Sequence, residues 1–173
     1  MKFITLLFLF LIYLSCSNHP SDKNPGFNKL GLDTSADVYS VTAEDDSMNA
    51  AIFRAKITLG IFDKALEPND TSLSDFAVKK KYPTADDGGE HMWVAVIKTV
   101  DGNYKGIVNN DAEKTTEVAY GDTVTVRKKE ITDWMYLDHN VLRGGYTIRA
   151  IRNKLTKEEQ IKMDRDLGFK IED

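Results

Sequence analysis

A strand that is apolar on both of its faces places the strongest constraint on how this chain folds. The segment EHMWVAVIKTV spans residues 90–100, and alternate side chains of an extended strand point to opposite faces. One face carries Glu90, Met92, Val94 and Val96, and the other carries His91, Trp93, Ala95 and Ile97. Because both faces are mostly apolar, the pattern predicts a central strand that other elements cover on both sides.

An amphipathic helix precedes this strand and is suited to cover one face of a sheet. Apolar residues recur in it at spacings of four, three, four, three and four, at Met48, Ile52, Ala55, Leu59, Phe62 and Leu66. That spacing forms one face of an α-helix. Asp45, Asp46 and Ser47 stand where an N-cap belongs, and Pro68 ends the pattern. Gly60 inside the helix indicates close packing or a kink.

The segment FAVKKKYP, residues 76–83, predicts a second strand. Phe76, Val78 and Tyr82 fall on one face of it, and Lys79 and Lys81 fall on the other. We therefore expect a half-exposed strand whose lysines form a solvated edge.

Turns and further short strands follow in close succession. Asp101-Gly102 predicts the turn of a hairpin, and Asp138-His139-Asn140 predicts the tip of another. A further strand carries Val124 and Val126. Upstream, residues 37–41 alternate and predict one more short strand.

The C-terminal part of the chain is helical in pattern. A helix-like stripe runs through Tyr146, Ile148, Ile151 and Leu155. Thr156 and Glu159 then form a capping box for a helix that Gly168 ends. The order of elements predicts an α+β fold. Its sheet is antiparallel and curled or barrel-like, packed by the N-terminal helix, with one or two C-terminal helices.

The first residues have the pattern of a targeting segment. Lys2 is followed by an apolar run from residue 3 to 14, which is shorter than the roughly 20 residues of a membrane-spanning helix. Leu14-Ser15-Cys16 then resembles a bacterial lipobox, in which the cysteine is lipidated and becomes the first mature residue. Tyr13 departs from the leucine usual in that pattern. A plain secretory signal, with Cys16 incidental, is the alternative.

These features predict the domain organisation and the location. Residues 1–15 form a lipoprotein signal peptide, residues 16–36 a flexible tether and residues 37–173 a single α+β domain. Lipid on Cys16 would hold the protein in the bacterial cell envelope, stably if the anchor carries several acyl chains. No acidic run follows Cys16, so we expect it to face the periplasm. The net charge of −4 argues against a nucleic-acid partner.

The motifs EHMW, GIVNN, YGDTV, ITDW and GGYTIR, in this order, resemble the YegJ-like bacterial family, known as domain of unknown function number 2314. The resemblance covers the chain from about residue 37 to its end and implies no assigned reaction. It therefore transfers no catalytic residue. The family motifs fall on Glu90, His91, Met92, Trp93, Asn109, Gly121, Asp122, Asp133, Trp134, Gly144, Gly145, Tyr146 and Arg149.

Little in the sequence indicates chemistry. It contains no HExxH motif, no cysteine pair, no calcium loop and no nucleophile elbow. Glu90 and His91 are strand neighbours that point apart, so they are poorly placed to chelate one ion. We expect no metal and no cofactor.

A few polar residues beside the tryptophans are the candidates for a site. Desolvation next to a tryptophan would raise the pKa of Glu90 or Asp133. Alternatively, Glu90 pairs with Arg149 or caps a turn. The candidate ligand-binding residues are Glu90, Trp93, Asp133, Trp134 and Arg149. If they meet in one groove, they would suit a peptide or a sugar, but the sequence does not show whether they meet.

The function we expect is that of a non-enzymatic, lipid-anchored envelope protein that binds a partner protein or a small ligand. An immunity or inhibitor protein is a variant of this hypothesis. The alternative is a small envelope hydrolase with Glu90, His91 and Asp133 as its catalytic residues.

Overall fold

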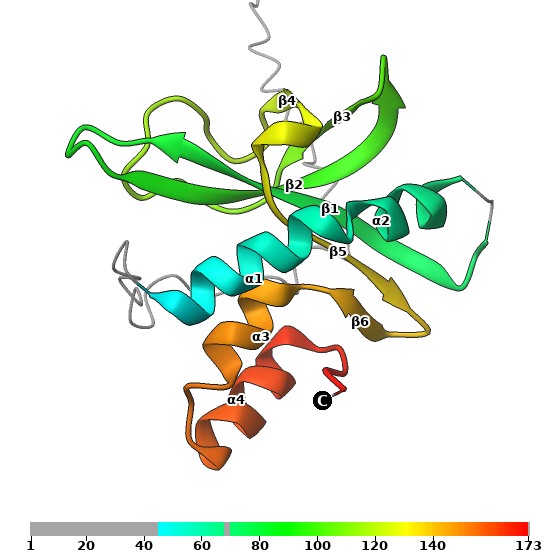
Figure 1. Cartoon of the computed structure of the whole chain (residues 1–173), viewed down its shortest axis with the longest axis vertical. Helices are drawn as coiled ribbons and strands as arrows, with labels where there is room; N and C mark the ends of the chain where they lie inside the picture. The colour runs from blue at the N-terminus through cyan, green and yellow to red at the C-terminus, as the bar shows by residue number, and fades with distance from the viewer. Residues whose placement is uncertain (1–44, 68–69, 173) are drawn as a thin grey trace, which may run out of the picture.

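The computed structural model describes residues 45–67 and 70–172 (Figure 1). The predicted lipidation at Cys16, the tether of residues 16–36 and the strand of residues 37–41 lie outside this range. The described elements are α1 (Asp46–Ile57), α2 (Leu59–Leu66), β1 (Leu73–Pro83), β2 (Gly89–Val100), β3 (Asn103–Val108), β4 (Thr123–Val126), the 3-10 helix η2 (Lys128–Glu130), β5 (Ile131–Asp138), β6 (Val141–Gly144), α3 (Tyr146–Arg152) and α4 (Lys157–Leu167).

The strands form one open sheet in the order β4-β3-β2-β1-β5-β6. Every pairing in it is antiparallel, and the sheet does not close into a barrel. Figure 1 shows α1 and α2 crossing the sheet one after the other, with α3 and α4 beside β6, at the end of the sheet opposite β4. The predicted α+β class with an antiparallel sheet is confirmed.

Strand β2 is central, as its two apolar faces predicted, but Ile97 is 60% exposed, so the predicted cover on both faces is only partly present. It pairs with β1 on one side and with β3 on the other. The turns at Asp101-Gly102 and His139-Asn140 are confirmed as well. All four turn residues have positive φ angles, between 48° and 73°, as two-residue hairpin turns require.

Strand β1 is also central, so the prediction that its lysines form a solvated edge is wrong. β1 lies between β2 and β5, and Lys79 and Lys80 are half-buried, whereas Lys81 is exposed. The physical reason is that β5, some 50 residues further along the chain, pairs with the side of β1 that β2 leaves free. Nothing in the local sequence of β1 encodes that partner.

Each face of the sheet packs into its own apolar core. On the first face, Val78, Met92 and Trp134 pack against Ala55 of α1 and Phe62 of α2. The second face packs instead against helices α3 and α4. Its core contains Ala77, Trp93, Met135, Leu137, Leu142, Ile148, Leu167 and Phe169. The N-terminal helices therefore cover one face and the C-terminal helices cover part of the other.

The predicted N-terminal helix is present as two helices. Asp45 caps α1 by accepting hydrogen bonds from the backbone N–H groups of Ser47 and Met48. The helix breaks at Thr58, whose hydroxyl donates to the Arg54 carbonyl oxygen at 2.7 Å, a contact that bends helices. A Cβ added at Gly60 would meet no atom within 4 Å. The break thus lies two residues before Gly60, and Gly60 is not closely packed.

The C-terminal elements agree with their sequence signals. Thr156 caps α4 in a capping box with Glu159, and Gly168 ends that helix with a φ of 72°. Beyond α4, the chain returns to β6. The backbone N–H of Leu142 donates to the Lys170 carbonyl at 2.8 Å, and the N–H of Lys170 donates to the Asn140 carbonyl at 2.9 Å.

Candidate functional site

The Glu90 side chain caps a loop. Its two carboxylate oxygens accept hydrogen bonds from the backbone N–H groups of Glu113, Lys114 and Thr115 at 2.8, 2.9 and 2.8 Å. Partial burial raises the pKa of the Glu90 carboxyl, but these three donors outweigh it and hold the pKa below its usual value. Of the two alternatives to a catalytic role, turn capping is therefore the one that this structure has.

Asp133 is completely buried and holds the start of α3. One oxygen accepts from the N–H groups of Trp134 and Tyr146, and the other accepts from the N–H and the hydroxyl of Thr147, over distances of 2.6 to 3.1 Å. The N-cap position itself is Gly145, which offers no side chain. Burial raises the pKa of the Asp133 carboxyl, opposed by Lys79 and the hydrogen bonds from Thr147. Asp133 thus replaces a missing helix cap.

Lys79 joins Asp133 from the neighbouring strand, a contact that the sequence analysis missed. The Lys79 ammonium donates to the Thr147 hydroxyl oxygen at 2.9 Å, and that hydroxyl donates to Asp133. The same ammonium lies 4.8 Å from the centre of a Trp93 ring. Burial lowers the pKa of Lys79, opposed by the charge of Asp133. The alternation of side chains in β1 predicts which face of the sheet Lys79 lies on. Its proximity to Asp133 depends on the pairing of β1 with β5, which the sequence does not show.

His91 lies on the same face, next to two cations. Its Nδ1 is 3.0 Å from the Thr132 hydroxyl oxygen. Burial, together with the charges of Lys79 and Lys81, lowers the pKa of His91 to about 4. The imidazole is therefore neutral at pH 7.

The two tryptophans lie on opposite faces of the sheet. Trp134 is in the first core, where its indole N–H donates to the Ala55 carbonyl oxygen at 2.9 Å. Trp93 is in the second core and is 4% exposed. Its indole N–H has no hydrogen-bond partner among the described residues. Glu90 alternates with Trp93 along β2, so the five candidate ligand residues do not share one surface.

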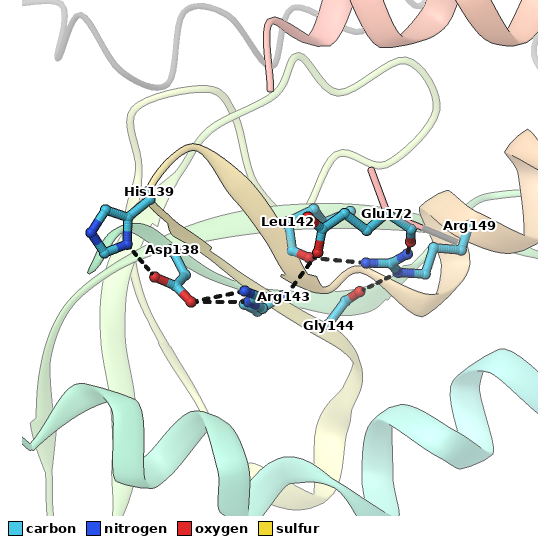
Figure 2. Close-up of polar contacts among 7 residues, drawn as sticks. All are labelled: Asp138, His139, Leu142, Arg143, Gly144, Arg149 and Glu172. Atoms are coloured by element: carbon cyan, nitrogen blue, oxygen red, sulfur yellow. Dashed lines mark hydrogen bonds and ion pairs between the residues drawn. The ribbon is translucent and has the colours of Figure 1, made fainter. Parts of the chain in front are cut away.

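Arg149 binds the C-terminal segment to the backbone of β6 (Figure 2). Its guanidinium donates to the carbonyl oxygens of Leu142, Gly144 and Glu172. Beside it, Arg143 donates to the Asp138 carboxylate at 2.9 Å and reaches the Glu172 carboxylate at 3.4 Å. Arg149 is thus bound to the backbone and does not pair with Glu90.

Part of the second face, on β2 and β3, remains uncovered. Ile97 is 60% exposed and Ile107 is 37% exposed. Asn109 continues this row, because its backbone N–H donates to the Trp93 carbonyl oxygen at 2.9 Å. Its buried side-chain nitrogen also lacks a partner among the described residues. We call this region the open surface; it consists of Ala95, Ile97 and Ile107, and it borders the buried Trp93 on β2 and the half-buried Asn109 directly after β3.

The described residues contain neither a metal-binding cluster nor a membrane-spanning helix. Across residues 45–67 and 70–172, no three His, Cys, Asp or Glu side chains are placed to hold a metal ion together. In the same part of the chain, no helix has the length and apolar character needed to cross a membrane.

Comparisons with known proteins place the chain among bacterial sequences without an assigned activity. The family model described as "Uncharacterized protein conserved in bacteria (DUF2314)" matches residues 45–171. A Neisseria meningitidis serogroup B protein named "Putative ankyrin repeat protein" is 34% identical over 144 residues, which are 79% of this chain and 56% of that protein. The uncharacterized protein YegJ of Escherichia coli K12 is 32% identical over 117 residues, which are 67% of this chain and 74% of YegJ. The chain thus spans little more than half of the first relative. No solved structure matches it.

Proposed function

We propose that this chain, which belongs to the DUF2314 family of uncharacterized bacterial proteins, is a lipid-anchored envelope protein that binds a ligand or partner and catalyses no reaction. The matches confirm the resemblance to YegJ-like proteins that the motifs predicted. The proposal rests on how the domain uses its polar side chains and on the pattern of the first residues.

One observation carries the preference for binding over hydrolysis. Acid–base catalysis by two carboxyl groups needs both of them within reach of one substrate. Glu90 and Asp133 are on opposite faces of the sheet, and each has its oxygens occupied by backbone N–H groups. This arrangement favours a structural role for both carboxylates and disfavours the hydrolase alternative.

The open surface has the chemistry of a binding site. Ala95, Ile97 and Ile107 provide an apolar area, and the neighbouring Trp93 and Asn109 each carry a buried N–H donor without a partner among the described residues. The Lys79 ammonium is close to Trp93. An unpaired buried donor costs about 1–3 kcal/mol, so a ligand oxygen that reaches and accepts from either donor would relieve that cost. We infer a ligand or partner segment with an apolar side chain and a carboxylate.

Nuclear magnetic resonance of the indole N–H groups tests this binding. The chain has two tryptophans, so two indole signals are expected, and Trp93→Phe assigns them. N-acetylleucine, which joins an apolar side chain to a carboxylate, serves as the probe. Saturable movement of the Trp93 signal, with the buried Trp134 signal as internal control, is the expected result. Asn109→Ala should weaken the binding. If neither indole signal moves at millimolar concentrations of N-acetylleucine, this ligand class is ruled out.

The anchor is tested separately. The apolar run of residues 3–14 and Leu14-Ser15-Cys16 support lipidation of Cys16 and a position in the envelope that faces the periplasm. Cys16→Ala should abolish fatty-acid labelling of the protein. Ser15→Ala, which keeps a small residue before the cysteine, is the matched control and should keep the label. Labelling that persists in Cys16→Ala would refute the anchor.

A further inference from the structure

The outer side of α1 and α2 carries an apolar stripe that no other described element covers. Phe53, Ile57 and Ile61 are spaced by four residues and are 64%, 65% and 52% exposed. Ala55 and Phe62 of the same helices are fully buried in the first core. The stripe therefore lies on the side of the helices that faces away from the sheet.

Cationic side chains border the stripe. Arg54, Lys56 and Lys64 are exposed on the same two helices. The acidic residue between positions 53 and 64 is Asp63, whose carboxylate already accepts hydrogen bonds from Lys128 and Tyr104. An apolar stripe with a cationic border is typical of helices that lie in the interface of an anionic membrane.

We propose that Phe53, Ile57 and Ile61 dock α1 and α2 onto the lipid surface to which the chain is anchored. This inference rests on the proposed anchor at Cys16, and the sequence separates that residue from Asp45, at the start of α1, by 28 residues. As a flexible coil, the 21 residues of the predicted tether (16–36) would have a root-mean-square span of about 25 Å. The helices α1 and α2 have 12 and 8 residues, about 18 Å and 12 Å long at 1.5 Å per residue. The anchor would therefore hold the whole stripe within reach of the bilayer.

This docking fixes an orientation. The helices α1 and α2 cover the first face of the sheet, and the open surface is on the second face. With α1 and α2 on the membrane, Trp93, Ile97 and Ile107 would point away from it. A ligand or partner would then approach from the aqueous side.

Spin labelling tests the docking on the full chain. Cys16 is the only cysteine, so in the lipidated protein a single introduced cysteine takes the label. The test position is Ile57→Cys. The control is Ile161→Cys on α4, because Ile161 is 66% exposed and Ile57 is 65% exposed. The protein is reconstituted in vesicles of phosphatidylethanolamine and phosphatidylglycerol. Collision rates of each label are measured with oxygen, which enters the bilayer, and with a water-soluble nickel chelate.

The expected result is a higher oxygen-to-nickel collision ratio at position 57 than at position 161, because the helix face would be buried in the headgroup and acyl boundary. Reversing the charge of the border with Lys56→Glu and Lys64→Glu should lower that collision ratio in these anionic vesicles. Equal ratios at the two positions would overturn the inference. Weak collisions with both reagents at position 57 would also overturn it, because they would mean that a protein segment or a second copy covers the stripe.

Failure of the anchor gives a different result. The mass of the mature chain shows whether Cys16 carries lipid, and its absence refutes the proposed function before any vesicle is made. In that case the free thiol is replaced by serine and the labelled chain is added to the same vesicles. A label at position 57 that stays in water then overturns the docking as well, and one that enters the bilayer supports it.

Discussion

His91 should make the domain sensitive to mild acid. Its ring is half-buried beside Lys79 and Lys81, and its pKa in the folded protein is lowered to about 4 from the ordinary 6.5. The unfolded chain then binds the proton more readily than the folded chain. The contribution of neutral His91 to the free energy of unfolding is fully present above the unfolded pKa. It is lost as the pH falls from about 6.5 towards 4.

The magnitude follows from the two pKa values. At pH 5, about 97% of His91 side chains would be protonated in the unfolded chain, against about 10% in the folded chain. The corresponding loss in the free energy of unfolding between pH 7.5 and pH 5 is about 2 kcal/mol. It approaches about 3 kcal/mol below pH 4. The carboxylates with lowered pKa values, such as Glu90, lose their contribution mainly below pH 4.5 or so, outside this window.

Urea denaturation at pH 7.5 and pH 5 measures this loss, with His91→Asn as the comparison. Asparagine keeps a polar atom near the position of Nδ1, which is 3.0 Å from the Thr132 hydroxyl, but it does not titrate. His139 is present in both proteins, so the difference between them reports His91. Equal losses in the two proteins would refute the argument that burial and the two lysines keep the ring neutral.

Three further predictions concern stability. Glu90→Gln leaves at least one N–H of residues 113–115 without an acceptor, so we expect a loss of about 1.5–3 kcal/mol. Amide hydrogen exchange in that loop should accelerate, and unchanged exchange would contradict the capping role. Asp133→Asn should cost about 3 kcal/mol or more in urea denaturation, because one amide group cannot accept from all four donors; a loss below about 1 kcal/mol would contradict this. Gly106→Ala places a Cβ 2.1 Å from the Ala95 carbonyl oxygen and should lower the melting temperature sharply, whereas Gly60→Ala meets no atom within 4 Å and should raise stability by about 0.5–1 kcal/mol.

Local signals in the sequence predicted local structure well. The turn at His139-Asn140, the capping box of Thr156 and the two apolar faces of β2 depend on residues that are close together in the chain. The same reasoning applies to the cap of α1 at Asp45. Each of these features is fixed by backbone preferences and side-chain periodicity, so one stretch of sequence contains the necessary information.

The features that could not be predicted from the sequence depend on pairing between strands that are far apart in the chain. Lys79 was predicted at a solvated edge because the sequence does not show that β5 pairs with β1. The same pairing sets Asp133 opposite Lys79, and it places Trp134 on the face opposite Trp93. Within a single strand, odd-numbered and even-numbered residues lie on opposite faces, so the sequence shows which of them share a face. The relation between two strands depends on their register, which no local pattern encodes.

The C-terminal segment beside β6 occupies a sheet edge at which another chain could otherwise add. An open sheet ends in strands with unpaired backbone groups, which can template the addition of another chain. Lys170 occupies part of that edge by exchanging backbone hydrogen bonds with Asn140 and Leu142, and Arg149 holds the following residues in place. At the opposite edge, β4 has only four residues. Removing residues 170–173 would expose the edge of β6 while keeping Phe169 in the second core, and strand-mediated oligomers should then form.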